Sequence, residues 1–135
     1  MTRATYVCDA SAIVAALTSD EADGQWAAQL LAMSDLAAPH LALFESANIL
    51  RRLELSGALP SGEAAQAHAD LLRLPLQVWP YEVLAERSWQ LRGHLSIYDA
   101  SHVALAELLD VPLVTLDRGI AGAPGPRCTV LVPDR

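Results

Sequence analysis

The chain has 135 residues and a net charge of -7 at pH 7, which fits a single domain over residues 1–135. Its longest stretch without a charged side chain, Gly24 to Ser34, is far shorter than the roughly 18 to 20 apolar residues that a membrane helix needs. Asp9 interrupts the N-terminal apolar run before the core of a signal peptide is complete, so we expect a cytoplasmic protein.

Short apolar runs typical of strands alternate along the chain with longer segments of helical periodicity. In chain order we expect a strand over Thr5 to Cys8, helices over Ala10 to Leu17 and Asp23 to Met33, a strand over Asp35 to Ala38, helices over Leu41 to Leu55 and Ser61 to Leu74, a strand over Leu76 to Trp79, helices over Tyr81 to Leu95 and Ile97 to Leu109, and strands over Pro112 to Leu116 and Cys128 to Val132. The stretch Gly119 to Pro126 is expected to be a mobile loop. This alternation predicts an α/β domain of three layers, α/β/α, with a mostly parallel central sheet of about five strands.

Four acidic residues lie in otherwise apolar stretches. Asp9 and Asp117 each end a predicted strand, and Glu45 and Asp99 lie near the starts of predicted helices. Singly, each has a simpler explanation: Asp9 suits a helix N-cap and Asp117 a turn. Glu45 and Asp99 suit the positive end of a helix dipole. Because ligands bind at the carboxyl ends of strands in open parallel sheets, all four can also point into one site.

A cluster of bare carboxylates needs a counter-charge, since two unit charges 4 Å apart repel by about 4 kcal/mol at an effective dielectric of 20. Oxygen ligands without matched His or Cys favour Mg²⁺ or Mn²⁺ over zinc. Ser11, Asn48 and Thr115 lie close enough in sequence to support such a site, although Ser11 also suits a helix cap and Thr115 an ordinary strand position. His102, at i+3 from Asp99, is interpreted as solvent-facing or hydrogen-bonded.

All nine basic residues are arginine. The absence of lysine argues against P-loop hydrolases, receiver domains and haloacid-dehalogenase-type phosphatases, whose sites are completed by a lysine.

Four segments, taken in order and spacing, resemble the PIN domain family, specifically VapC-type toxins, over nearly the whole chain. They are Val7-Cys-Asp-Ala-Ser-Ala12, Ala38-Pro-His-Leu-Ala-Leu-Phe-Glu-Ser-Ala-Asn-Ile-Leu-Arg-Arg52, Tyr98-Asp-Ala-Ser-His-Val-Ala-Leu-Ala106 and Val114-Thr-Leu-Asp117. The resemblance implies a Mg²⁺- or Mn²⁺-dependent endoribonuclease that leaves 5′-phosphate and 3′-hydroxyl ends. It also implies the toxin half of a type II toxin-antitoxin pair, a homodimer held inactive by a VapB-like antitoxin.

The same resemblance carries catalytic and metal-binding roles to Asp9, Glu45, Asp99 and Asp117, with Ser11, Asn48 and Thr115 as supporting residues. The chain departs from the family after Asp117. Many relatives continue into a helix with an apolar anchor, whereas Arg118-Gly119 leads here into a Gly- and Pro-rich stretch.

Net negative charge argues against RNA binding by bulk electrostatics. Assigning four acids to a metal weakens this objection, as does a dimer that gathers arginines around a groove, with Arg51, Arg52, Arg92 and Arg118 as candidates. Two other functions stay open. One is a catalytically silent PIN-like interaction module with an apolar surface around Leu17, Trp26 and Leu30. The other is a nuclease acting on DNA or flaps, although flap-type relatives carry large insertions that this chain lacks.

Overall fold

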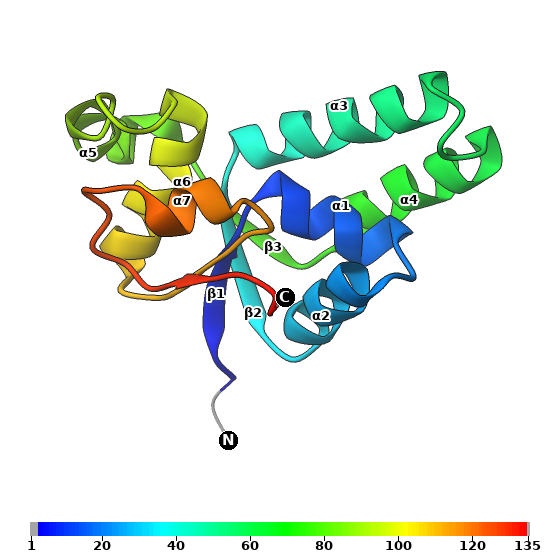
Figure 1. Cartoon of the computed structure of the whole chain (residues 1–135), viewed down its shortest axis with the longest axis horizontal. Coiled ribbons are helices and arrows are strands. Elements are labelled where there is room, and N and C mark those ends of the chain that lie inside the picture. The colour runs from blue at the N-terminus through cyan, green and yellow to red at the C-terminus, as the bar shows by residue number, and fades with distance from the viewer. Residues whose placement is uncertain (1–2, 135) are drawn as a thin grey trace.

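The structure, a computed structural model, describes residues 3–134 (Figure 1). Its strands are β1 (Thr5–Cys8), β2 (Asp35–Pro39), β3 (Leu76–Trp79), β4 (Leu113–Val114) and β5 (Val130–Leu131). Its helices are α1 (Ala10–Thr18), α2 (Ala22–Ala32), α3 (Leu41–Leu55), α4 (Ser61–Arg73), the 3₁₀ turn η1 (Tyr81–Val83), α5 (Ala85–Gln90), α6 (Ile97–Leu109) and α7 (Arg118–Gly122). The strands pair in the order β3-β2-β1-β4-β5, and every pairing is parallel.

Helices cover both faces of the sheet, with α1 to α4 on one side and α5 to α7 on the other (Figure 1). The strand pleat explains the division, because successive side chains point to opposite faces. Val7 packs with α6, whereas the next residue, Cys8, packs with α1 and α4. The same alternation holds for Leu113 and Val114 on β4. The three-layer α/β/α fold with five strands is the one that the sequence predicts.

Two tight packing features join consecutive elements. A Cβ added at Gly24 would lie 2.3 Å from the Ser19 carbonyl oxygen, so α2 can approach the end of α1 only with glycine there. Helix α3 is followed by Gly57, whose φ of 82° is the left-handed conformation that glycine adopts at little cost. Both glycines keep the α1 to α4 layer compact.

The single helix expected over Tyr81 to Leu95 is wrong. The chain forms η1 and the short helix α5 instead, followed by turns before α6. The buried residues Leu84, Ser88 and Leu91 recur at helical spacing, which explains the expectation. Two short turns present these residues to the core as well as one long helix does.

The mobile loop expected over Gly119 to Pro126 is also wrong in its first half. Residues Arg118–Gly122 form α7, and Ile120 is almost fully buried against the core on the α6 side. The departure from the family pattern after Asp117 is therefore smaller than the sequence suggests, because this helix does carry an apolar anchor. Within residues 3–134, no helix combines the length and apolar character needed to cross a bilayer.

Candidate functional site

The four acidic residues come either after strands or near the starts of helices at the carboxyl edge of the sheet. Asp9 comes directly after β1, and Asp117 follows β4, its neighbour in the sheet. Glu45 is carried by α3, which follows β2, and Asp99 lies in the first turn of α6. In Figure 1 the starts of α1, α3 and α6 gather above this edge, near the beginning of α7.

Asp9 is buried and hydrogen-bonded through both carboxylate oxygens. Its Oδ1 atom accepts from the Ala12 backbone N–H at 3.0 Å and from the Ser11 hydroxyl at 2.6 Å. Its Oδ2 atom accepts from the Thr115 hydroxyl. Asp9 is thus the N-cap of α1, as one interpretation of the sequence has it, and it is also oriented by a residue from the far end of the chain.

Ser11 and Thr115 join the loop after β4 to the start of α1. The Ser11 Oγ atom accepts from the Leu116 backbone N–H at 3.1 Å, and the Thr115 Oγ1 atom accepts from the Asp117 N–H at 2.9 Å. Each hydroxyl therefore donates to Asp9 and accepts from the loop. This arrangement fixes the Asp9 side chain and the backbone before Asp117 in one network.

Glu45 and Asp99 are half-buried and interact electrostatically with the rest of the cluster. Burial raises the pKa of the Glu45 carboxyl; His102 opposes this rise, and the charges of Asp99 and Asp9 add to it. Burial likewise raises the pKa of Asp99, with a further contribution from the charge of Asp117. The shared charges indicate that all four acids belong to one cluster. Glu45 lies beyond the first turn of α3, so the helix-dipole explanation does not apply to it.

Asp117 and Asn48 are exposed. The apolar neighbours of Asp117 in the sequence indicate a buried side chain, so its exposure differs from that expectation. The Asp117 Oδ1 atom accepts from the Gly119 N–H at 2.8 Å and so caps α7. Its second carboxylate oxygen faces no hydrogen-bond donor among the described residues, which leaves it available to a ligand.

His102 is the residue of this region whose closeness to the acidic cluster the sequence interpretation missed. It is buried and hydrogen-bonded, with Nδ1 2.8 Å from the Tyr98 carbonyl oxygen, which fits one of the two interpretations. Its Nε2 atom is buried without a partner among the described residues. Its position at i+3 from Asp99 was the signal that it faces the cluster.

The donor set suits a hard divalent cation. Within residues 3–134, no three His, Cys, Asp or Glu side chains are arranged as a ready-made cation site. The cluster nevertheless offers carboxylate and hydroxyl oxygens, the ligands that Mg²⁺ and Mn²⁺ prefer. The Glu45 Oε1 atom is also buried with no hydrogen-bond partner, a costly state that a cation would relieve. The chemistry of these donors, rather than their present arrangement, is therefore what suits a divalent ion.

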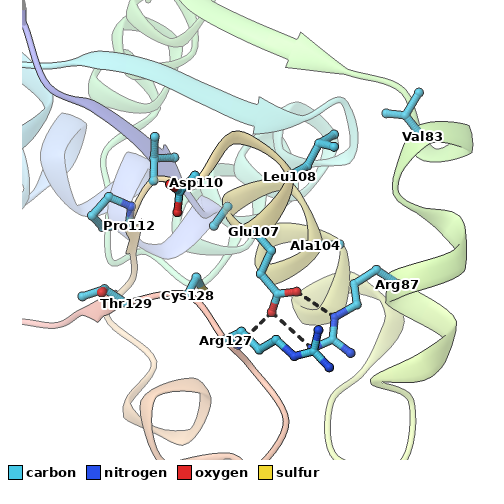
Figure 2. A pocket seen from close by; sticks show the side chains of 12 residues that line it. Val83, Arg87, Ala104, Glu107, Leu108, Asp110, Pro112, Arg127, Cys128 and Thr129 are labelled. Carbon is cyan, nitrogen blue, oxygen red and sulfur yellow. Dashed lines mark hydrogen bonds and ion pairs between the residues drawn. The ribbon is translucent and has the colours of Figure 1, made fainter.

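A separate cavity of about 550 Å³ lies beside the C-terminal half of α6 (Figure 2). Its main polar feature is an ion pair between Arg87 and Glu107, with the Arg87 Nε atom 2.7 Å from the Glu107 carboxylate. Glu107 also accepts from the Arg127 backbone N–H at 2.8 Å. Burial would raise the pKa of Glu107, but these hydrogen bonds hold it below its usual range. The pair connects α5, α6 and the segment before β5, so we assign it a structural role.

Replacing Glu107 with glutamine is expected to lower the free energy of unfolding by about 2 kcal/mol, because the charge-assisted bonds to Arg87 are lost in a mostly buried setting. Urea unfolding followed by circular dichroism measures the difference. Glu21→Gln, at an exposed glutamate without a side-chain cap bond, is the control and should leave the midpoint unchanged. Equal midpoints for the two variants would contradict the structural role.

Comparisons with known proteins agree on one family. The model of the PIN domain family matches residues 6–125. The VapC ribonuclease Mb0985 of Mycobacterium bovis is 42% identical over 129 residues, which cover 96% of this chain and 98% of that protein. The crystal structure of VapC20 of Mycobacterium tuberculosis, a Sarcin-Ricin loop cleaving toxin, has a TM-score of 0.66 at 20% identity and covers 87% of this chain and 95% of its own.

A second structure, VapBC-5 of Mycobacterium tuberculosis, belongs to the VapBC family of toxin-antitoxin systems. It has a TM-score of 0.60 at 23% identity and covers 96% of this chain and 97% of its own. At such identities the two structures establish the shared fold, which is the three-layer fold described above.

Proposed function

This chain belongs to the PIN domain family, of the VapC type, and from that premise we propose that it is a metal-dependent endoribonuclease, the toxin of a toxin-antitoxin module. The observation that carries the proposal is the cluster of four acids at the carboxyl edge of the sheet, in which burial and mutual charge raise the pKa of Glu45 and Asp99. Chains named VapC ribonucleases match it over nearly its whole length.

In the proposed site, Asp9 and Asp99 hold Mg²⁺ or Mn²⁺ directly, and Glu45 and Asp117 complete the shell directly or through water. When bound, such an ion acidifies a water molecule and stabilises the negative charge that develops on phosphate. Thr115 and Ser11 keep the Asp9 carboxylate in a fixed orientation. Glu45, whose pKa is raised by burial, is suited to accept the proton of the attacking water.

The proposed partners are an RNA substrate, a VapB-like antitoxin and a second copy of the chain, acting in the cytoplasm. Support for the antitoxin comes from the VapBC-5 structure, a toxin-antitoxin system with the same fold. The alternative of a catalytically silent interaction module is less well supported, because Leu17, Trp26 and Leu30, around which its surface is expected, are partly buried against the core. We therefore favour the nuclease.

The direct test is cleavage of total cellular RNA by the purified chain, freed of antitoxin, with Mg²⁺, with Mn²⁺ and with EDTA. We expect cleavage with either metal, products with 5′-phosphate ends, and none with EDTA. Cleavage of single-stranded DNA at the same rate would favour the general nuclease instead. If no RNA is cut under any metal condition, the proposal is wrong.

Metal binding can be measured without activity. We expect Mg²⁺ or Mn²⁺ to raise the melting temperature, since a ligand at a hundredfold excess over its dissociation constant stabilises a fold by about 2.7 kcal/mol. Asp99→Asn should shrink this shift, whereas Asp23→Asn, at an exposed site on α2, should preserve it. Equal shifts in all three proteins would show that Asp99 is not a ligand.

A further inference from the structure

Exposed aromatic side chains gather at one place on this molecule. Among residues 3–134, the exposed aromatic residues of large size are Phe44, Tyr81, Trp89 and Tyr98. Three of these four, all but Trp89, line a single cavity of about 560 Å³. We call this cavity the aromatic pocket. Its lining residues are Pro39, His40, Leu41, Phe44, Pro80, Tyr81, Glu82, Ile97, Tyr98 and Ser101.

The aromatic pocket lies beside the acidic cluster because both are built from the starts of α3 and α6. Phe44 immediately precedes Glu45, and Tyr98 immediately precedes Asp99. Consecutive residues of a helix point about 100° apart, so on each helix one residue faces the pocket and the next faces the cluster. A strand whose phosphate lies at the acids therefore has its adjacent nucleotides within reach of the pocket.

The ring of Phe44 is held in position by His40, edge to face, with the ring centroids 5.7 Å apart. The remainder of the Phe44 side chain is open to solvent, at 67% exposure. Tyr98 is 57% exposed on the opposite helix. Both rings line the aromatic pocket and are open to solvent, so a planar group in the pocket can stack on them.

The net negative charge of the chain also favours a ligand that binds by stacking over one that binds through its phosphates alone. With sixteen acidic and nine basic residues, the chain attracts phosphates weakly as a whole. Two of its arginines are engaged elsewhere, since Arg118 donates to the Pro133 carbonyl and Arg92 stacks on Trp89. Base stacking on aromatic side chains does not depend on charge, so it can supply affinity that the phosphates do not.

We propose that the aromatic pocket binds an unpaired nucleobase of the RNA strand, stacked on Phe44 and Tyr98, next to the phosphate held at the acidic cluster. This inference rests on the proposed function and names its substrate as unpaired RNA. Polar atoms at the wall give the pocket a preference. Ser101 is almost fully buried, with its hydroxyl donating to the Tyr98 carbonyl at 2.7 Å, whereas the exposed Glu82 carboxylate is an acceptor at the wall. The Glu82 carboxylate can accept from the amino groups of adenine, cytosine or guanine, which uracil lacks.

The test compares Phe44→Leu and Tyr98→Leu with Trp89→Leu, which removes the exposed aromatic residue outside the pocket. Each change keeps an apolar side chain at an exposed position, so melting temperatures should stay close to that of the unchanged chain. We expect the two pocket variants to raise the KM for cleavage of a single-stranded RNA by about 5- to 100-fold. Trp89→Leu should leave KM unchanged.

Binding is measured separately with the Asp9→Asn chain, which isolates affinity from cleavage. Oligoadenylate is expected to bind more tightly than oligouridylate, and both more tightly than an abasic ribose-phosphate oligomer of equal length. Equal binding of the base-bearing and abasic oligomers would overturn the pocket assignment. So would pocket variants that keep KM but change self-association or antitoxin binding, because the pocket would then be a protein contact.

The two proposals fail in different ways. The proposed function is wrong if the chain without substitutions cuts no RNA in the presence of metal. The pocket assignment is wrong if Phe44→Leu and Tyr98→Leu cleave RNA normally with an unaltered KM. Failure of the pocket assignment therefore leaves the proposed function standing, and the two failures can be told apart.

Discussion

The Asp9→Asn chain is expected to cleave RNA about 100- to 1,000-fold more slowly than the unchanged chain while it keeps its fold, because a carboxylate that would hold the metal ion is replaced by a neutral amide. Asparagine is a good N-cap, and its Oδ1 atom can still accept from Ala12 and Ser11. Its amide can donate to Thr115, whose oxygen is also an acceptor. The substitution therefore removes the charge and leaves the local hydrogen bonds largely in place.

Rates of cleavage under metal saturation and melting curves measure the two effects separately. Asp23→Asn is the matched control, since it removes an equal charge from the exposed first turn of α2. A chain with Asn at position 9 that cuts RNA at the normal rate would falsify the assignment of Asp9 to the site. A chain that unfolds would instead show that the bonds from Ser11 and Thr115 need the carboxylate.

The Glu45→Gln chain is expected to cleave RNA about a hundredfold more slowly than the unchanged chain. In the absence of metal at pH 7, it is nevertheless expected to be the more stable of the two. Burial and the neighbouring charges raise the pKa of Glu45 in the folded state, so its ionised form opposes folding. A carboxyl group whose pKa is raised in the folded state stabilises the fold while it is protonated. This contribution is complete at pH values below the ordinary carboxyl pKa, and it is lost as the pH rises through the pKa of the folded state. Glutamine does not titrate, so the advantage of the variant should shrink as the pH falls toward 4.

Melting temperatures at pH 4 and pH 7, with EDTA present, test this sign. Glu54→Gln, an exposed glutamate near the end of the same helix, should show no such pH-dependent gain. Saturating Mg²⁺ should reverse the order at pH 7, because the unchanged chain alone keeps the full set of carboxylates. If Glu45→Gln is less stable than the unchanged chain at pH 7 without metal, the burial of this charge does not oppose folding.

The sequence predicts the layers of this fold well because apolar strands and helical periodicity are local signals. It predicts the region after β3 poorly. Leu84 and Leu91 lie seven residues apart, a spacing that one helix or two short turns can satisfy equally. It also fails to predict α7, because most of this helix lies in the glycine- and proline-rich stretch Gly119 to Pro126, although Ile120 packs against the core. Tertiary packing decides such short elements.

For the candidate site, the sequence identifies the four acids and Thr115 through their positions at the ends of strands and the starts of helices. The exposure of Asp117 could not be predicted, because its apolar neighbours precede it in β4 whereas its own side chain caps α7. The burial of His102 was not predicted either, although its position at i+3 from Asp99 indicates the helix face that it shares with the cluster. The assignment of these residues to catalysis stays a prediction.

The network around Asp9 has a consequence for a chain that is still being synthesised. Thr115, which binds the Asp9 carboxylate, lies 106 positions further along the chain. Strand β4, which directly precedes Thr115, pairs with β5, and the Thr115 N–H donates to the Leu131 carbonyl. A nascent chain can form α1 early, since segments near the N-terminus emerge from the ribosome first. It cannot orient Asp9 as described until residue 131 is in place. The surroundings of Asp9 are therefore completed late, by the C-terminal part of the sheet.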